Sequence, residues 1–146
     1  MENKSTVEFT AKKYIPEEIK HVTTQALAFY PELQDIKIEF KFNENIRKSV
    51  MQAQPKYVTM YKSRQKRTYL IKLSRYFIIK QQEILIQNLP EDVLIGWIGH
   101  ELGHIMDYIK RNAWSMLLFG IGYSSSRSFI ISAERTADTY AVNHGL

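Results

Sequence analysis

Two of the four histidines in this 146-residue chain, His100 and His104, stand four positions apart with Glu101 between them. On an α-helix, residues i and i+4 lie on the same face, so both imidazoles can reach one metal ion. Glu101 projects from the same side of the turn, close enough to act on a metal-bound water without binding the metal itself. The spacing predicts the site of a zinc hydrolase. The alternative is a chance grouping of three polar residues on one helix face.

A zinc site needs a third ligand, and the carboxylates that follow the motif are few. After His104 the chain offers only Asp107, Glu134 and Asp138. Asp107 lies one turn further on the same helix and is expected to support a ligand from behind or to lie at the surface. Glu134 can complete a two-histidine, one-glutamate site with an open fourth position. Asp138, one turn after Glu134, can accept a hydrogen bond from the far nitrogen of a ligating imidazole. The alternative is two solvated acids on a surface helix.

The element that must position the histidines is a helix that begins near Pro90. Glu91 and Asp92 follow this proline, which suits the first turn and the positive end of the helix dipole. The helix is apolar nearly all round, which predicts burial on most sides. Polar groups in that setting are costly unless they have partners, which argues against a chance grouping. Its apolar members are Val93, Leu94, Ile95, Trp97, Ile98, Leu102, Ile105, Met106 and Ile109.

Three glycines, Gly96, Gly99 and Gly103, share this helix beside the histidine face. Each costs about 1 kcal/mol relative to alanine in a helix interior, and they fall within about 60° of one another. We expect them to let a strand pack closely over the helix.

The remaining pattern predicts an α+β domain spanning residues 1–146. A helix is expected from Pro16 to the residue before Pro31, and strict alternation predicts a strand over residues 36–42. Residues 57–61 and 68–73 are expected to pair as a hairpin around the turn-like 62–66.

Three further segments complete this assignment. Residues 76–88 are ambiguous between strand and helix. Residues 120–128 are expected to form a loop that could overhang the cleft. Residues 132–142 predict a helix that Gly145 ends, and this helix carries Glu134 and Asp138 on one face.

Composition restricts the classes of function. The chain is 45% hydrophobic and 24% charged, typical of a globular domain, and it has no cysteine, which excludes disulfides and thiolate metal sites. The N-terminus has no apolar core of a signal peptide. The longest apolar run, residues 114–123, covers about half a membrane span. We therefore expect a cytoplasmic protein with no transmembrane segment.

The net charge is +5, and much of the basic excess lies in the middle of the chain. A nucleic-acid patch is one interpretation, but no nucleic-acid motif accompanies the charge. A solvated sheet face and a charged turn are favoured instead. The basic residues are Lys56, Lys62, Arg64, Lys66, Arg67, Lys72, Arg75 and Lys80.

Two segments together resemble a known group of enzymes. Residues 100–104 read His-Glu-Leu-Gly-His and residues 134–138 read Glu-Arg-Thr-Ala-Asp. This pair resembles the gluzincin clan of zinc metallopeptidases, and the second segment is similar to the Glu-x-x-Ala-Asp signature of the Ste24/HtpX-like peptidases and the minigluzincins. The resemblance covers roughly residues 66–146. It implies a small zincin-like domain: a mixed, mostly antiparallel sheet packed on an active-site helix, with a C-terminal glutamate helix.

The resemblance also assigns roles to residues. It implies that His100, His104 and Glu134 bind one Zn²⁺, that Glu101 is the general base, and that Asp138 orients His100. It further implies that a strand before the active-site helix, here residues 68–73, binds an extended peptide or protein substrate by strand addition.

An oxyanion donor usually completes such a site. The sequence offers Tyr123, Arg127, Tyr140 and His144 as candidates and does not choose among them.

Three functions stay open at this point. The first is a zinc-dependent endopeptidase. The second is a zincin-like binding or regulatory module that holds zinc but is latent or inactive, and a related form of the first cleaves a single regulatory target. The third is a basic nucleic-acid-binding domain with an incidental motif. Substrate and oligomeric state are not specified by the sequence.

Overall fold

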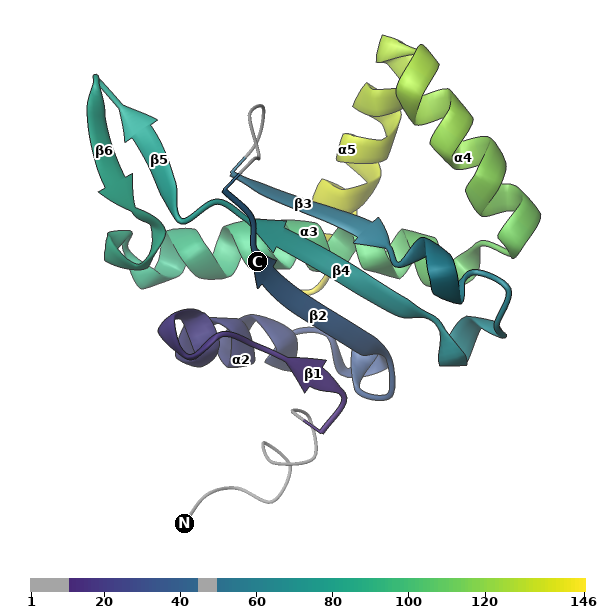
Figure 1. Cartoon of the computed structure of the whole chain (residues 1–146), viewed down its shortest axis with the longest axis horizontal. Helices are drawn as coiled ribbons and strands as arrows, with labels where there is room; N and C mark the ends of the chain where they lie inside the picture. Colours follow the sequence, from purple (N-terminus) through teal and green to yellow (C-terminus); the bar gives the residue numbers. More distant parts are fainter. Residues whose placement is uncertain (1–10, 45–49) are drawn as a thin grey trace.

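The computed structural model of the chain describes residues 11–44 and 50–146. Its main sheet has four strands in the order β1-β2-β4-β3 (Figure 1). The pairs β1–β2 and β2–β4 are parallel, while β3 runs antiparallel to β4. The main sheet is therefore mixed, as expected, but two of its three pairings are parallel, so it is not mostly antiparallel. The strands are β1 (Lys13–Tyr14), β2 (Lys37–Phe42), β3 (Met51–Pro55) and β4 (Thr68–Leu73).

Four α-helices and a separate hairpin accompany the sheet in the described part of the chain. The hairpin is formed by β5 (Tyr76–Ile79) and β6 (Gln82–Leu85) and projects beside the start of α3 (Figure 1). The helices are α2 (Lys20–Ala28), α3 (Glu91–Lys110), α4 (Ala113–Ser125) and α5 (Arg127–Asn143). Short 3₁₀ helices join these elements: η1 (Glu17–Ile19), η2 (Pro31–Leu33), η3 (Tyr57–Thr59), η4 (Arg64–Lys66) and η5 (Ile86–Asn88).

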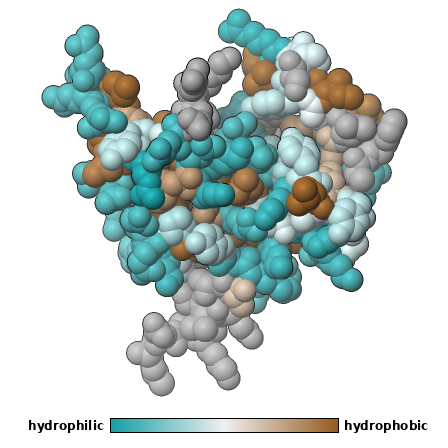
Figure 2. Space-filling model, viewed as in Figure 1, coloured by the Kyte–Doolittle hydropathy of each residue, from teal (hydrophilic) through white to brown (hydrophobic). Residues whose placement is uncertain are grey.

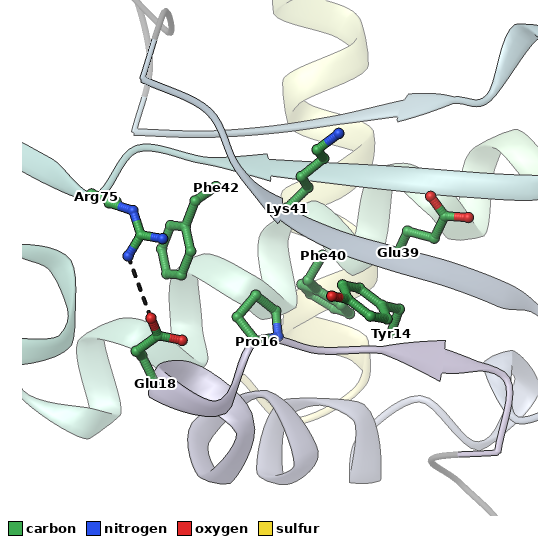
Figure 3. Close-up of a pocket in the computed structure, with 8 residues that line it drawn as sticks. All are labelled: Tyr14, Pro16, Glu18, Glu39, Phe40, Lys41, Phe42 and Arg75. Carbon is green, nitrogen blue, oxygen red and sulfur yellow. Dashed lines mark hydrogen bonds and ion pairs between the residues drawn. The ribbon is translucent and has the colours of Figure 1, made fainter.

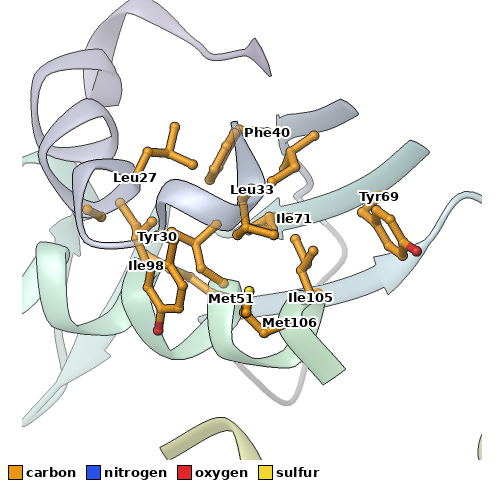
Figure 4. Close-up of a cluster of buried hydrophobic side chains, with 14 of the residues drawn as sticks. Leu27, Tyr30, Leu33, Phe40, Met51, Tyr69, Ile71, Ile98, Ile105 and Met106 are labelled. Atoms are coloured by element: carbon orange, nitrogen blue, oxygen red, sulfur yellow. The ribbon is translucent and has the colours of Figure 1, made fainter. Parts of the chain in front are cut away.

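The core lies between the sheet and the helices α2 and α3. In β2, Ile38 and Phe40 are buried while Lys37 and Lys41 are exposed, as the alternating pattern predicts. The same face meets apolar side chains of α2 and α3, among them Leu27, Ile98 and Ile105, and the ring of Tyr30, which precedes η2 (Figure 4). Helix α3 therefore passes under the sheet with most of its surface covered.

The predicted strand over residues 68–73 is confirmed as β4, but its predicted hairpin partner is wrong. Residues 57–59 form a 3₁₀ helix, and Tyr57, Val58 and Tyr61 are exposed, so no apolar face exists there for a sheet. The partner is β3, six residues earlier, where alternate residues are buried. Thr59 closes the connection, because its hydroxyl accepts the Thr68 N–H at 3.0 Å.

The structure also shows the secondary structure of two segments for which the sequence predicted none or only a loop. The ambiguous residues 76–88 form the hairpin β5–β6 and η5. The loop expected over residues 120–128 is absent, because α4 continues to Ser125 and α5 begins at Arg127. Ser126, between them, accepts the Phe129 N–H with its side chain at 3.4 Å and so caps α5. Across residues 11–44 and 50–146, no helix combines the length and the apolar character that crossing a membrane needs.

The glycines of α3 do not pack against the expected strand. A Cβ atom at Gly103 would lie 2.4 Å from the Ala137 carbonyl oxygen of α5. A Cβ at Gly99 would lie 2.1 Å from Cδ1 of Leu146, and one at Gly96 would meet nothing within 4 Å. The prediction of a strand over the glycines is wrong: Gly103 instead allows α5 to approach α3.

The outer face of the sheet carries polar side chains and is largely hydrophilic (Figure 2). Two of the basic residues noted in the sequence form ion pairs, Lys56 with Glu39 of β2 at 3.0 Å and Arg75 with Glu18 of η1 at 3.4 Å. Arg67 is different, because it is buried and its guanidinium donates to the carbonyl of Arg111 at the end of α3 at 2.8 Å. Three of the eight basic residues noted in the sequence therefore have partners within the protein.

Candidate metal centre

The two histidines of α3 face a glutamate of α5. His100 Nε2 lies 2.9 Å from Glu134 Oε2, and His104 Nε2 lies 3.3 Å from Glu134 Oε1. One ligand atom from each of the three side chains lies within 4.8 Å of the other two, so the group could hold a metal ion. The structure therefore brings together residues that lie up to 34 positions apart in the sequence.

Two imidazoles and a carboxylate are donors that a divalent metal ion such as zinc accepts. Tetrahedral zinc binds nitrogen and oxygen at about 2.0–2.2 Å, which separates neighbouring ligand atoms by roughly 3.4 Å. The separations of the two histidine nitrogens from Glu134, 2.9 and 3.3 Å, are close to that value, and all three ligand atoms lie within 4.8 Å of one another. The side chains of His100 and Glu134 are 26% and 41% exposed, whereas His104 is 8% exposed, so the centre is reachable from solvent. Three protein ligands and an approach from solvent are typical of catalytic zinc rather than structural zinc.

Asp138 supports His100 from behind. Its Oδ1 lies 2.7 Å from Nδ1 of His100, so Nδ1–H donates to the carboxylate and Nε2 faces Glu134. Burial lowers the pKa of His100, but the bond to Asp138 and the nearby carboxylates outweigh it, and the pKa lies above its usual value. Burial lowers the pKa of His104 below its usual value, which favours the neutral imidazole that a metal needs.

Glu101 is buried beside the two histidines and is held by the sheet. Its Oε2 accepts the backbone N–H of Ala53 in β3 at 2.7 Å. Burial raises its pKa to about 7, against the opposing effects of His100 and of the Ala53 N–H. A carboxyl group with such a pKa can take up and release a proton near neutral pH.

Sequence reasoning missed two residues, Tyr108 and Ala53. The Tyr108 hydroxyl donates to the Ala53 carbonyl at 3.3 Å, and its ring stacks on His104 with centroids 6.1 Å apart. Ala53 is thus fixed at both backbone groups by side chains of α3. Tyr108 follows His104 by four positions and so shares its helix face, a signal that could have been found. The Ala53 contacts depend on tertiary packing and had no such signal.

The oxyanion candidates separate clearly. Tyr123 lines the pocket that Ala53 and Tyr108 also line, and burial, followed by the charges of Glu134 and Glu101, raises its pKa. His144 lies elsewhere: its nitrogens contact the Tyr140 carbonyl at 2.7 Å and Glu32 at 3.0 Å. Of the two, only Tyr123 is brought to the cluster.

The other candidates have positions of their own. Arg127 is exposed at the first residue of α5, two turns before Glu134. The Tyr140 hydroxyl contacts Lys110. Asp107 forms an ion pair with Arg111 at 2.9 Å rather than supporting a histidine by a hydrogen bond.

The edge strand beside the centre is β3, not the strand expected from the sequence. Strand β4 is paired with β2 on one side and β3 on the other, so strand addition at residues 68–73 is ruled out. Strand β3 has a single pairing partner among the described strands and lies against α3 through Ala53. A peptide that adds to this sheet near the centre would add to β3.

Two small pockets lie beside the contact between Glu101 and Ala53, one lined by Glu101 and the other by Ala53. One, of about 190 Å³, is lined by Val50, Met51, Trp97, His100 and Glu101. The other, of about 210 Å³, is bounded by β3 and by aromatic side chains of α3 and α4. A larger cavity of about 600 Å³ lies between β1, η1 and β2, where Arg75 stacks on Phe42 and pairs with Glu18 (Figure 3). No residue of the metal cluster lines that larger cavity.

No protein-family model, no curated protein and no solved structure matches the chain. The residues of the cluster and their geometry are therefore the grounds for assigning a function.

Proposed function

We propose that the protein is a zinc-dependent endopeptidase with a zincin-like fold, in which His100, His104 and Glu134 bind one Zn²⁺. The observation that carries the proposal is the convergence of these three ligands beside Glu101, with separations that suit zinc. The hydrogen bond from His100 to Asp138 is the kind of support that ligating histidines usually have. A mixed sheet over the histidine helix and a separate glutamate helix are consistent with this fold assignment.

The chemistry follows from the positions of the side chains. A bound zinc ion would lower the pKa of a water molecule and polarise a peptide carbonyl. Glu101 accepts a proton from the attacking water as the water oxygen bonds to the carbonyl carbon. It then returns that proton to the leaving nitrogen, so the C–N bond breaks and an acid and an amine are released. Tyr123, beside Glu134, is the candidate donor to the oxyanion.

Two variants test the assignment of ligand and base. Glu134→Gln should lose high-affinity zinc, measured by elemental analysis and by competition with a chromophoric chelator. Glu101→Gln should keep stoichiometric zinc and lose cleavage of a diverse peptide mixture, read by mass spectrometry. Glu91→Gln, an exposed glutamate in the first turn of the same helix, is the matched control and should change neither property.

Each result bears on a different part of the proposal. Retained zinc affinity and stoichiometry in Glu134→Gln would overturn the third ligand. Stoichiometric zinc in the unmutated protein without cleavage of any peptide would favour the second candidate, a zincin-like module that binds zinc but does not turn over. Equal cleavage by Glu101→Gln and the unmutated protein would refute the role of the base.

A further inference from the structure

Residues 50–75 carry a concentration of positive charge that the metal centre does not use. This segment has seven lysine and arginine residues and no aspartate or glutamate, whereas the rest of the chain has a small negative balance. It comprises β3, β4 and the connection between them, residues 56–67. The net charge of +5 therefore comes from one continuous part of the protein. The basic residues of this segment are Lys56, Lys62, Arg64, Lys66, Arg67, Lys72 and Arg75.

Most of these cations have no acidic partner. Lys56 and Arg75 form ion pairs, and Arg67 is buried with its guanidinium bonded to two carbonyl groups. The other four take part in none of the ion pairs of residues 11–44 and 50–146. Three of these four are exposed in the connection, and the fourth is half-buried on β4. They are Lys62, Arg64, Lys66 and Lys72.

Lysines of β2 extend this charge across the sheet. Lys41 is the register partner of Lys72, so both side chains point to the outer face. Lys37 lies four residues before Lys41 and therefore on the same face, where both are exposed. Glu39, between them, is already paired with Lys56. The outer face, which Figure 2 shows to be hydrophilic, is thus basic overall.

Two tyrosine side chains stand among the cations of the connection and are largely exposed. Tyr57 is 69% exposed and Tyr61 is 82% exposed. Neither ring packs on another aromatic ring of the described residues. The sequence predicted a strand here, which would have turned one tyrosine face into a sheet, but the structure presents both rings to solvent. Every nucleobase has a flat π-face that stacks on such a ring.

The connection that carries these side chains has a defined structure. The Thr59 hydroxyl accepts the Thr68 N–H at 3.0 Å, which joins the start of the connection to its end. The buried Arg67 donates to the carbonyl of Lys62 at 3.2 Å and to the carbonyl of Arg111 at 2.8 Å. Because these bonds use the backbone of Lys62, its ammonium group stays available. A platform that is already ordered loses little conformational entropy when it binds a ligand.

We propose that this basic surface binds single-stranded nucleic acid, DNA or RNA, without sequence preference. The cations contact phosphates, and the two tyrosines stack on unpaired bases. A duplex fits less well, because its bases are stacked on one another and paired. A lipid surface is also a poorer match, since Val58 is the only aliphatic side chain that residues 56–67 expose. The surface comprises Lys37, Lys41, Tyr57, Tyr61, Lys62, Arg64, Lys66 and Lys72.

The test titrates the full chain into fluorescein-labelled oligothymidylate and oligouridylate of about 12 nucleotides, with fluorescence anisotropy as the readout. We expect dissociation constants of about 1–100 μM at about 0.1 M salt, the range of non-specific binding. Contact with four phosphates predicts that the logarithm of the binding constant falls with that of the salt concentration with a slope of about −3. A duplex of the same length and vesicles of phosphatidylglycerol and phosphatidylcholine are titrated in parallel.

Substitutions separate stacking from charge. Tyr61→Ala should weaken binding about tenfold and leave the salt slope unchanged, because it removes a ring and no charge. The triple variant Lys62→Gln, Arg64→Gln, Lys66→Gln should reduce the slope from about −3 to about −1, since three phosphate contacts are lost. All four side chains are exposed, so the fold should be retained, which circular dichroism checks.

The hairpin β5–β6 supplies matched controls. Tyr76 and Lys80 are exposed there, at the opposite end of β4 from the connection (Figure 1). Tyr76→Ala and Lys80→Gln should change neither the affinity nor the salt slope. If Tyr61→Ala weakens binding no more than Tyr76→Ala does, the proposed stacking is wrong and the inference is overturned.

The remaining outcomes decide between ligands. Tighter binding of either single strand than of the duplex, with a slope that the triple variant reduces, supports the inference, and the two oligonucleotides show whether DNA or RNA is preferred. Equal affinity for duplex and single strands, no binding of either oligonucleotide, or binding of the vesicles alone would overturn it. None of these results bears on the proposed peptidase, because the surface contains no ligand of the metal centre and zinc affinity is measured separately.

Discussion

A single methyl group at Gly103 tests whether the approach of α5 to α3 determines the metal centre. Its Cβ would lie 2.4 Å from the Ala137 carbonyl oxygen, where ordinary contact begins at 3.4 Å. The obstacle is backbone and cannot rotate away, so α5 must withdraw by roughly 1 Å or the helices must separate locally. Overpacking of this kind costs about 1–3 kcal/mol, against a gain of about 1 kcal/mol in helix propensity.

The displacement acts directly on a metal ligand. Glu134 precedes Ala137 by three residues on α5, whereas both histidines are on α3. Metal–ligand distances are tolerated within about 0.2 Å, so a shift of roughly 1 Å separates the glutamate from the histidine pair. Gly103→Ala should therefore lower zinc affinity by about 10–100-fold or more while leaving the two histidines in place.

Gly96→Ala is the control on the same helix. A Cβ there meets nothing within 4 Å, so this variant gains helix propensity alone and should be more stable by about 0.5–1 kcal/mol. Urea unfolding with a chelator present measures stability without metal, and chelator competition measures zinc affinity. If Gly103→Ala matches Gly96→Ala in stability and binds zinc as the unmutated protein does, the proposed coupling of helix approach to ligand geometry is refuted.

Other substitutions address the supports of the centre. Asp138→Asn should lower zinc affinity by about 10–100-fold in chelator competition, because His100 loses its charged acceptor; unchanged affinity would contradict that role. Tyr108→Phe keeps the ring but removes the bond to Ala53, and should lower the free energy of unfolding by about 0.5–1.5 kcal/mol in urea titration. Zinc at 100 times its Kd should stabilise the fold by about 2.7 kcal/mol, a rise in Tm of roughly 6–10 °C by calorimetry. The same addition to Glu134→Gln should give little shift, and an equal shift would place the ion elsewhere.

The parts of the fold that the sequence predicted are those with a strong local pattern. Alternation over residues 36–42 predicts β2, because one face of that strand is buried and the other is solvated. Strand β3 was missed because Gln52, Gln54 and Pro55 give it low strand propensity, and its burial comes from contact with α3. The hairpin prediction assumed that neighbouring strand-like runs pair. That assumption failed because Tyr57 and Tyr61 are exposed and do not pack against the core.

In the candidate site, too, the sequence predicts what depends on local spacing and not what depends on tertiary contacts. The geometry of one helix fixes the spacing of His100 and His104, so the sequence predicts that both face one point. Glu134 was proposed from its residue type and from its helical spacing to Asp138. Its actual distance to the histidines depends on how α5 crosses α3 at Gly103. That crossing is a tertiary contact, and the sequence indicated only that the glycines permit some close approach.

Helix α3 is therefore held on two sides by contacts that serve different parts of the chemistry. On the sheet side, Ala53 holds the carboxylate of Glu101, the group proposed to move protons. On the opposite side, α5 supplies Glu134 and Asp138, which bear on the metal and on the orientation of His100. Because the two contacts use separate elements, a change at the α3–α5 interface can remove the metal without freeing the base. We therefore expect the hydrogen bond between the Ala53 N–H and Glu101 to persist in a variant that has lost the metal. Both changes abolish activity, but only a change at the α3–α5 interface lowers zinc affinity, so the two measurements together distinguish that interface from the contact at Ala53.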